Sequence, residues 1–303
     1  MKPRFEKVSI IGLGLIGASI AAGLKQRGLT ERITAYDTNE ESLEIGMIQA
    51  VIDEKADSVA SCAKGSSLIV LSVPVLSIQA SLSQLKDAFF VKNRSGLSAV
   101  ITDVGSVKSP VLKAGREIFG EFPANLVPGH PIAGSEKHGV EAANPDLFEN
   151  QKVILTPTSA TDKDALRLVE EMWQCLGAKV IQMTAEHHDS VFAQTSHLPH
   201  LLAYALVDTL SVQGDSLEIF EYAAGGFRDF SRIAASDPVM WRDVFDANGE
   251  RVLNILDKYV DELGEIRSLI AEGKMEALEE LFRRAKVARD HFSSISEQEG
   301  KRK

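Results

Sequence analysis

Residues 8–37 read VSIIGLGLIGASIAAGLKQRGLTERITAYD, and their pattern predicts the fold of the first half of the chain. A short apolar run opens into Gly12, Gly14 and Gly17, spaced as G-x-G-x-x-G, and Asp37 stands twenty positions after the last glycine. A strand that turns through such glycines into a helix is typical of a dinucleotide site, where the pyrophosphate sits at the helix N-terminus. Small residues that only pack a helix on a strand are the alternative, and the acidic residue in its place favours the dinucleotide site.

Each glycine has a separate task in such a turn. The first makes the tight turn, the second lets the backbone approach the pyrophosphate, and the third lets the helix lie close on its strand. Leu15 and Ile16 stand between the last two glycines, so we expect both at the cofactor. We expect Asp37 to accept hydrogen bonds from the ribose hydroxyls of the adenosine. Because a carboxylate there would repel a 2′-phosphate, the sequence favours NAD over NADP.

Strand-like and helical patterns alternate along the first half of the chain. The runs expected as strands are residues 67–73, 99–103, 152–156 and 178–183. This alternation predicts an α/β Rossmann-type domain, with a mostly parallel sheet and helices on both faces. From Thr184 onward the strand signal stops, and long amphipathic segments follow at residues 198–210, 239–263 and 275–292.

The change at Thr184 predicts two domains. We expect an NAD-binding Rossmann-type domain over residues 1–184 and an all-α domain over residues 185–303. Several of the later helices are apolar on more than a narrow stripe, as expected of buried or interface helices. We therefore expect the second domain to supply substrate-binding residues and a homodimer interface.

Composition narrows the function classes. The chain has 303 residues, 44% of them hydrophobic, and a formal charge of −10, which argues against a nucleic-acid partner because the phosphate backbone repels an acidic surface. Its two cysteines, Cys62 and Cys175, fit a reducing, cytoplasmic setting, and we expect both in the core. The uncharged residues 8–24 are fewer than the ~20 of a spanning helix, so we expect neither signal peptide nor membrane partner.

Two further segments are expected to wall the cofactor site. Ser72, Val73 and Pro74 follow one predicted strand, and Asp103 ends the next, shortly before Ser106. Ligands of parallel α/β sheets bind at the carboxyl ends of the strands, where both segments would lie. The alternative for Asp103 and Ser106 is a helix cap, which does not exclude contact with a ligand.

A Gly- and Pro-rich segment, residues 128–139, contains the candidate acid/base residue. Its sequence PGHPIAGSEKHG predicts a rigid loop, in which a side chain can be held still for catalysis. His130 stands between Gly129 and Pro131, and an ordinary pKa of ~6.5 suits proton transfer near neutrality. A buried histidine that only hydrogen-bonds a carbonyl is the alternative interpretation.

Four histidines follow within fourteen positions: His187, His188, His197 and His200. The last two are three residues apart and share a face if the segment is helical. A zinc site is the alternative, but no cysteine or glutamate completes an evident ligand set, and we expect no metal.

The last chemical cluster is the segment GGFRDFSR, residues 225–232. Asp229 and Arg232 are three residues apart, so a helix would let the carboxylate orient the guanidinium for bidentate recognition of an acid. A solvated surface pair is the alternative.

Together these motifs resemble the prephenate dehydrogenases of tyrosine biosynthesis, and the resemblance covers nearly the whole chain. The segments that carry it, in order, are residues 12–17 (GLGLIG), 103–108 (DVGSVK), 129–136 (GHPIAGSE), 196–200 (SHLPH) and 226–232 (GFRDFSR). The resemblance implies NAD-dependent oxidative decarboxylation of prephenate to 4-hydroxyphenylpyruvate, with arogenate as an alternative substrate that would give tyrosine. It also implies a homodimer formed through the helical domain.

The resemblance also implies roles for individual residues. His130 is similar to the catalytic histidine that takes the proton of the ring hydroxyl, and Ser106 to its positioning partner. Arg232 resembles the arginine that holds a substrate carboxylate. The other residues that the resemblance places around the substrate are Ser135, Glu136, His197, His200 and Asp229.

Two other classes share the glycine turn. A β-hydroxyacid dehydrogenase would be expected to carry a catalytic lysine on a helix of the second domain, and none stands out between Thr184 and Asp237. A non-catalytic NAD(H)-sensing protein would need only the glycine turn and has no use for His130, His200 and Arg232 together.

Overall fold

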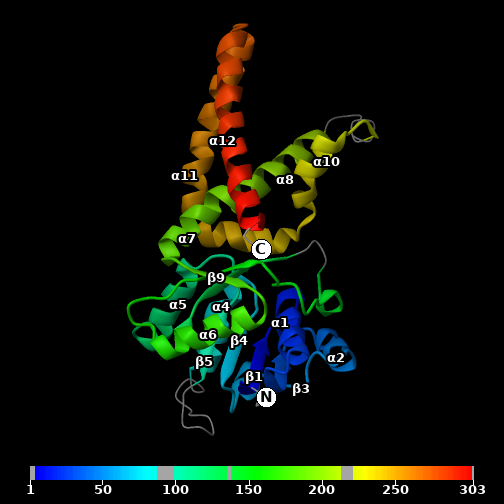
Figure 1. The fold of residues 1–303 in the computed structure, drawn as a ribbon, viewed down its shortest axis with the longest axis vertical. Helices are drawn as coiled ribbons and strands as arrows, with labels where there is room; N and C mark the ends of the chain where they lie inside the picture. The colour runs from blue at the N-terminus through cyan, green and yellow to red at the C-terminus, as the bar shows by residue number, and fades with distance from the viewer. Residues whose placement is uncertain (1–3, 87–98, 135–137, 213–220, 302–303) are drawn as a thin grey trace. The chain divides into compact units, whose positions relative to one another are not determined.

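The computed structural model describes residues 4–86, 99–134, 138–212 and 221–301 (Figure 1). The chain divides into two compact units, residues 1–251 and residues 252–303. All the strands of the described residues belong to the first unit. The second unit contains the C-terminal part of one long helix and the whole of the last helix.

The centre of the first unit is a six-stranded parallel sheet with the strand order β3-β2-β1-β4-β5-β6. Its strands are β1 (Phe5–Ile11), β2 (Thr30–Tyr36), β3 (Glu54–Lys55), β4 (Leu68–Leu71), β5 (Val100–Asp103) and β6 (Leu126–Val127). On one side of β1 the chain adds β2 and then β3, and on the other side it adds β4, β5 and β6. The order in which strands are added therefore reverses between β1 and β4. Ligands of such sheets bind outside the carboxyl ends of the strands at this switch point.

Helices cover both faces of this sheet (Figure 1). Successive side chains of a strand point to opposite faces, so Val70 belongs to one buried cluster and Leu71 to the other. The first cluster includes side chains of α1 (Leu15–Gln26), α2 (Glu40–Ile48) and α6 (Lys163–Cys175). The second includes side chains of α3 (Val59–Ala63), α4 (Ile78–Leu85) and α5 (Ser109–Phe119). The predicted parallel sheet with helices on both faces is confirmed.

A second, three-stranded sheet was not predicted. It has the order β7-β8-β9 and consists of β7 (Gly129–Ile132), β8 (Lys152–Leu155) and β9 (Lys179–Gln182). The predicted strands near residues 152 and 178 therefore form, but in a separate sheet, where β7 runs antiparallel to β8. The segment around His130, expected to be a loop, is the edge strand β7. An edge strand tolerates Pro131, which has no N–H to donate.

Among the described residues after Thr184 there are helices and no strands, as predicted. They are α7 (Ala185–Phe192), the π-helical turn η4 (Ala193–His197), α8 (Leu198–Ser211), α10 (Gly225–Ser231), the 3-10 turn η5 (Arg232–Ala235), α11 (Pro238–Ala271) and α12 (Met275–Lys301). The two compact units divide within α11, whereas the boundary expected near residue 184 follows the change from strands to helices. That domain boundary stays a prediction.

Two smaller observations bear on the sequence analysis. Cys62 is buried, but Cys175 is exposed at the end of α6, so the expectation that both lie in the core is wrong for Cys175. In the described ranges, no helix is both long and apolar enough to cross a membrane.

Candidate active site

The glycine turn joins β1 to α1 and has the geometry of a phosphate cradle. Gly12 has φ +94°, and a Cβ on it would lie 2.2 Å from the carbonyl oxygen of Ser72. A Cβ on Gly17 would lie 2.1 Å from the carbonyl oxygen of Gly12, so only glycine lets α1 approach the turn. A Cβ on Gly14 would meet nothing within 4 Å, and Gly14 is the N-cap of α1. The turn thus leaves open space at a helix N-terminus, which fits the pyrophosphate of a dinucleotide.

Leu15 and Ile16 form the first turn of α1, and both are half-buried. Val73 lies against the glycine turn, because its Cγ1 would be 3.1 Å from a Cβ on Gly12. Ser72, Val73 and Pro74 therefore follow β4 at the same edge of the sheet as the turn, where the sequence placed them.

Asp37 follows β2 and faces the glycine turn. Its Oδ2 accepts a hydrogen bond from the backbone N–H of Leu13 at 2.6 Å, and its Oδ1 accepts one from Asn39 N–H at 2.8 Å. Each oxygen keeps lone pairs for further donors, since a carboxylate accepts about four hydrogen bonds. The carboxylate is thus fixed beside the turn in the position expected for a ribose ligand.

Asp103 ends β5, but its side chain is fully buried and turned away from solvent. It forms an ion pair with the buried Lys108, and it accepts hydrogen bonds from the N–H groups of Gly105 at 2.8 Å and Gly129 at 3.2 Å. Lys108 Nζ also donates to the Gly129 carbonyl at 2.6 Å. The Asp103 carboxylate therefore ties β5 to β7, and the cofactor contact predicted for this residue would come from its backbone.

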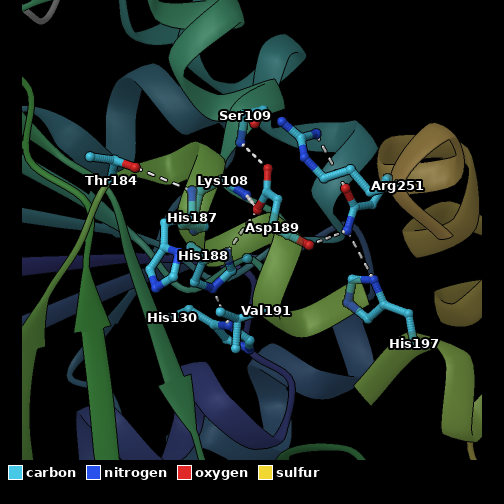
Figure 2. Close-up of polar contacts among 12 residues, drawn as sticks. Lys108, Ser109, His130, Thr184, His187, His188, Asp189, Val191, His197 and Arg251 are labelled. Carbon is cyan, nitrogen blue, oxygen red and sulfur yellow. Dashed lines mark hydrogen bonds and ion pairs between the residues drawn. The ribbon is translucent and has the colours of Figure 1, made fainter. Parts of the chain in front are cut away.

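His130 lies on β7 and contacts His188 on α7, as Figure 2 shows. Its Nδ1 is 2.8 Å from His188 Nε2, and the two ring centroids are 5.1 Å apart. The ring of Phe192 lies 5.0 Å from that of His130. The Nδ1 of His130 is thus occupied by His188, and the positioning role expected of Ser106 stays a prediction. Ser106 itself is half-buried in the turn between β5 and α5.

Asp189 is hydrogen-bonded to His188 and fixes its ring. His188 Nδ1 is 2.8 Å from Asp189 Oδ1, and the backbone N–H groups of Lys108 and Ser109 each donate to the same carboxylate at 2.8 Å. Burial raises the pKa of Asp189, but these donors outweigh it and leave the pKa below its usual range. Asp189 is therefore a carboxylate at neutral pH.

The histidines around this point are neutral at pH 7. Burial lowers the pKa of His130 well below its ordinary value, and the nearby His188, Lys108 and His197 lower it further. Burial also lowers the pKa of His188, against the opposing effect of Asp189. A neutral imidazole can accept a proton, so the site holds a base and not an acid in its resting state.

His197 and His200 both lie against Trp241 at the start of α11. The His200 ring stacks on Trp241 with a centroid distance of 3.9 Å, and the His197 ring meets it edge-on at 5.9 Å. Both rings contact Trp241, so the prediction that His197 and His200 share a face is confirmed. His200 Nδ1 is 2.8 Å from the carbonyl of Ser196, which can only accept, so the ring proton lies on Nδ1 and the Nε2 lone pair can accept.

Asn248 determines the proton position on His197. Its Nδ2 donates to the carbonyl of Asp189 at 2.9 Å and is 3.2 Å from His197 Nδ1, while its Oδ1 accepts from Arg251 at 3.4 Å. Because an amide nitrogen only donates, His197 Nδ1 accepts and the ring proton lies on Nε2. Burial lowers the pKa of His197 to about 4, so this ring is a neutral donor.

The predicted acid-binding pair lies on two consecutive elements. Asp229 is exposed on α10, and Arg232 begins η5. Burial is the main cause that lowers the pKa of His200, and the positive charge of Arg232 lowers it further. Arg232 and His200 therefore lie near each other. Ser135 and Glu136 lie outside the described residues. Across the described ranges, no group of three or more His, Cys, Asp and Glu side chains is placed to hold a metal ion.

Several residues of the candidate site were not singled out from the sequence. Asp189, Trp241 and Asn248 carry no spacing signal of their own, and Lys108 was quoted only as part of the segment 103–108. His188 was noted only as part of a histidine-rich stretch, and its pairing with His130 joins residues 58 positions apart.

A Rossmann-type sheet with a dinucleotide turn, and a neutral histidine at the carboxyl edge of that sheet, define a dinucleotide-dependent oxidoreductase. Comparison with known families agrees. The sequence model of the prephenate dehydrogenase nucleotide-binding domain matches residues 20–182, and that of the prephenate dehydrogenase dimerization domain matches residues 184–284. The chain belongs to the prephenate dehydrogenase family.

Individual relatives extend over nearly the whole chain. The prephenate dehydrogenase of Bacillus subtilis is 36% identical over 96% of this chain and 76% of the relative. The cyclohexadienyl dehydrogenase of Zymomonas mobilis is 34% identical over 94% of this chain and 95% of the relative. The prephenate dehydrogenase of Aquifex aeolicus, solved in complex with hydroxyphenyl propionate and NAD⁺, is 38% identical, has a TM-score of 0.84 and covers 95% of this chain and 98% of its own.

Proposed function

We propose that this protein oxidises prephenate with NAD and releases CO2, which gives 4-hydroxyphenylpyruvate for tyrosine biosynthesis. The observation that carries the proposal is the neutral His130 ring at the carboxyl edge of the large sheet. Gly129 is hydrogen-bonded to Asp103, the last residue of β5, and the glycine turn follows β1 at the same edge of this parallel sheet. The Aquifex aeolicus relative, solved with NAD⁺ and a hydroxyphenyl acid, supports the same assignment.

The bound dinucleotide supplies the acceptor for the hydride that leaves ring carbon C4. The glycine turn would hold its pyrophosphate, and Asp37 would accept hydrogen bonds from its adenosine ribose. Because Nδ1 of His130 is occupied by His188, Nε2 is the nitrogen that faces a substrate. His130 Nε2 takes the proton of the C4 hydroxyl as the hydride departs. When the ring carboxylate leaves as CO2, its bonding electrons complete the aromatic ring, and the same proton returns to the oxygen.

Arg232 is proposed to bind the side-chain carboxylate of the substrate, and His200 is proposed to contact the substrate through Nε2, which accepts a hydrogen bond. Prephenate carries two carboxylates, and the guanidinium of Arg232 is a cation that does not titrate in the physiological range. His197, with its proton on Nε2, adds a neutral hydrogen-bond donor beside them. Asp229, Ser135 and Glu136 remain predicted members of this polar shell.

Arogenate is the second candidate substrate. It differs from prephenate by an amino group in place of a keto group, and the same proton and hydride steps would give tyrosine. The Zymomonas mobilis relative, a cyclohexadienyl dehydrogenase, favours keeping this alternative. Glu136 is the carboxylate that could attract the ammonium group.

We also propose a homodimer. The matched dimerization domain supports it, and α11 and α12 expose large apolar side chains, namely Leu253, Val260, Leu263, Ile270, Phe282 and Val287. Light scattering on the purified protein tests the dimer by mass. A cytoplasmic location, expected from the two free cysteines, stays a prediction.

The test of function is the initial rate of NADH formation with prephenate and, separately, with arogenate. His130→Asn keeps a polar side chain but cannot take the proton, so we expect turnover to fall on the order of 10² to 10⁴-fold. His187→Asn is the matched control, because His187 is an exposed histidine on α7. Absence of turnover with both acids, despite bound NADH, would overturn the proposal and favour an NAD(H)-sensing protein.

A further inference from the structure

His130, His188 and Asp189 form a continuous hydrogen-bonded series that ends at the start of α5 (Figure 2). The side chains of His188 and Asp189 are 0% exposed, so no solvent competes for these bonds. Neither residue reaches the site surface, and the proposed reaction uses neither of them in a chemical step.

The proton positions follow from the end of the series. Asp189 is a carboxylate that already accepts the backbone N–H groups of Lys108 and Ser109, so towards His188 it can only accept. His188 Nδ1 must therefore carry a hydrogen. Because His188 is neutral, its Nε2 carries a lone pair and accepts a hydrogen bond. His130 Nδ1 must then be the donor, which leaves the lone pair of His130 on Nε2.

We propose that His188, oriented by Asp189, is a positioning residue that holds His130 in the tautomer whose Nε2 is the base. The kinetic consequence rests on the proposed function, but the tautomer itself is a property of the free protein. An unconstrained neutral imidazole distributes its proton over both nitrogens, and only one of the two forms can accept the substrate proton. After the transfer, the charged His130 ring donates to His188, whose other N–H points at the Asp189 carboxylate.

The first test is nuclear magnetic resonance of ¹⁵N-histidine-labelled protein without substrate. The chain has seven histidines, and the His130 signals are assigned from the spectrum of His130→Asn. We expect Nδ1 of His130 to be protonated and Nε2 to be unprotonated above pH 7. A proton on Nε2, or equal populations of the two tautomers, would overturn the proposal whatever the substrate is.

The second test compares two variants at position 188. His188→Leu removes the acceptor, so we expect mixed His130 tautomers and a kcat lower by roughly 10²-fold, with KM little changed because His188 does not touch substrate. His188→Gln offers an amide oxygen to His130 Nδ1 and should retain the tautomer, with a loss of about tenfold. His187→Leu and His187→Gln are the matched controls on the exposed face of the same helix.

The pH profile separates positioning from a general loss of structure. Among the described residues, the charged or titratable groups around His130 are His188 and Asp189 on α7, Asp103 at the end of β5, Lys108 shortly after it, and His197 on η4. In His188→Leu the charged His130 ring loses the acceptor of its Nδ1–H, so protonation of His130 becomes less favourable and the acid limb of kcat/KM should move to lower pH. An unchanged limb together with an unchanged kcat would contradict the proposal.

The two proposals can fail separately. If the wild-type protein turns over neither acid, the proposed function fails, and the wild-type spectrum still decides the tautomer. If the wild-type protein turns over prephenate but His188→Leu keeps kcat within about twofold, the function stands and the positioning role fails. Poor folding of the leucine variant would leave the wild-type spectrum and the glutamine variant to decide.

Discussion

The Asp37 carboxylate accepts two backbone N–H groups, one from Leu13 inside the glycine turn and one from Asn39. These bonds fix its position and leave its remaining lone pairs for the ribose hydroxyls of a dinucleotide. The same negative charge opposes a 2′-phosphate. We propose that this single residue combines a structural contact with the choice of cofactor, and its place beside the turn could be predicted from its spacing to the glycines.

We predict that Asp37→Asn raises the KM for NAD by roughly 10- to 100-fold, since a charge-assisted hydrogen bond contributes about 1.5–3 kcal/mol. Activity with NADP relative to NAD should rise, because the repulsion is removed. Initial rates with both cofactors measure this. Asp53→Asn is the matched control. Asp53 also accepts a backbone N–H, from Ile33 at 2.8 Å, but it stands at the amino end of a strand, directly before β3. Equal effects of both variants would refute the role of Asp37.

At the scale of elements, the break in α11 positions a site residue. Residues 239–263 were expected to form one continuous helix, but Asn248 has φ −128° and ψ 19°, which is not helical. Its amide instead joins the carbonyl of Asp189 to His197. Residues 239–263 contain no proline that would signal this break. The Asn248 side chain bonds two hydrogen-bond acceptors, one on α7 and one on η4.

We predict that Asn248→Ala lowers the free energy of unfolding by about 1–3 kcal/mol, because it leaves the buried His197 Nδ1 without its donor and removes one of the two donors of the Asp189 carbonyl, which still accepts from Ala193 N–H. Urea unfolding measures the difference. Asn254→Ala is the control, since Asn254 is exposed on the same helix and should change stability by less than about 0.5 kcal/mol. A stability of Asn248→Ala equal to that of the control would show that the two bonds contribute nothing.

At the scale of the whole molecule, the buried histidines make stability depend on pH. His130, His188, His197 and His200 all have pKa values lowered by burial. Unfolded histidines bind protons below pH about 6.5, whereas these folded ones resist protonation. The unfolded state therefore binds more protons as the pH falls, and stability is lost in that direction.

We predict that the free energy of unfolding is greatest above pH about 6.5 and decreases towards pH 4. His197 has a folded pKa of about 4. Because a tenfold change in proton affinity corresponds to about 1.4 kcal/mol, His197 alone should account for roughly 2–4 kcal/mol of the loss. Urea titrations at several pH values measure the slope. The slope should become shallower in His197→Gln and stay unchanged in His187→Gln; a flat profile in the wild type would contradict this.

Local spacing and the order of motifs along the chain were enough to predict the dinucleotide turn, the cofactor carboxylate, the alternation of strands and helices, and His130 as the candidate base. Three features became visible only in the folded chain: the separate three-stranded sheet, the inward turn of Asp103 towards Lys108, and the partner of His130. The reason is physical. The bonds from His130 to His188 and from Asn248 to Asp189 join residues 58 and 59 positions apart, and no local pattern encodes contacts that form only when strands and helices pack.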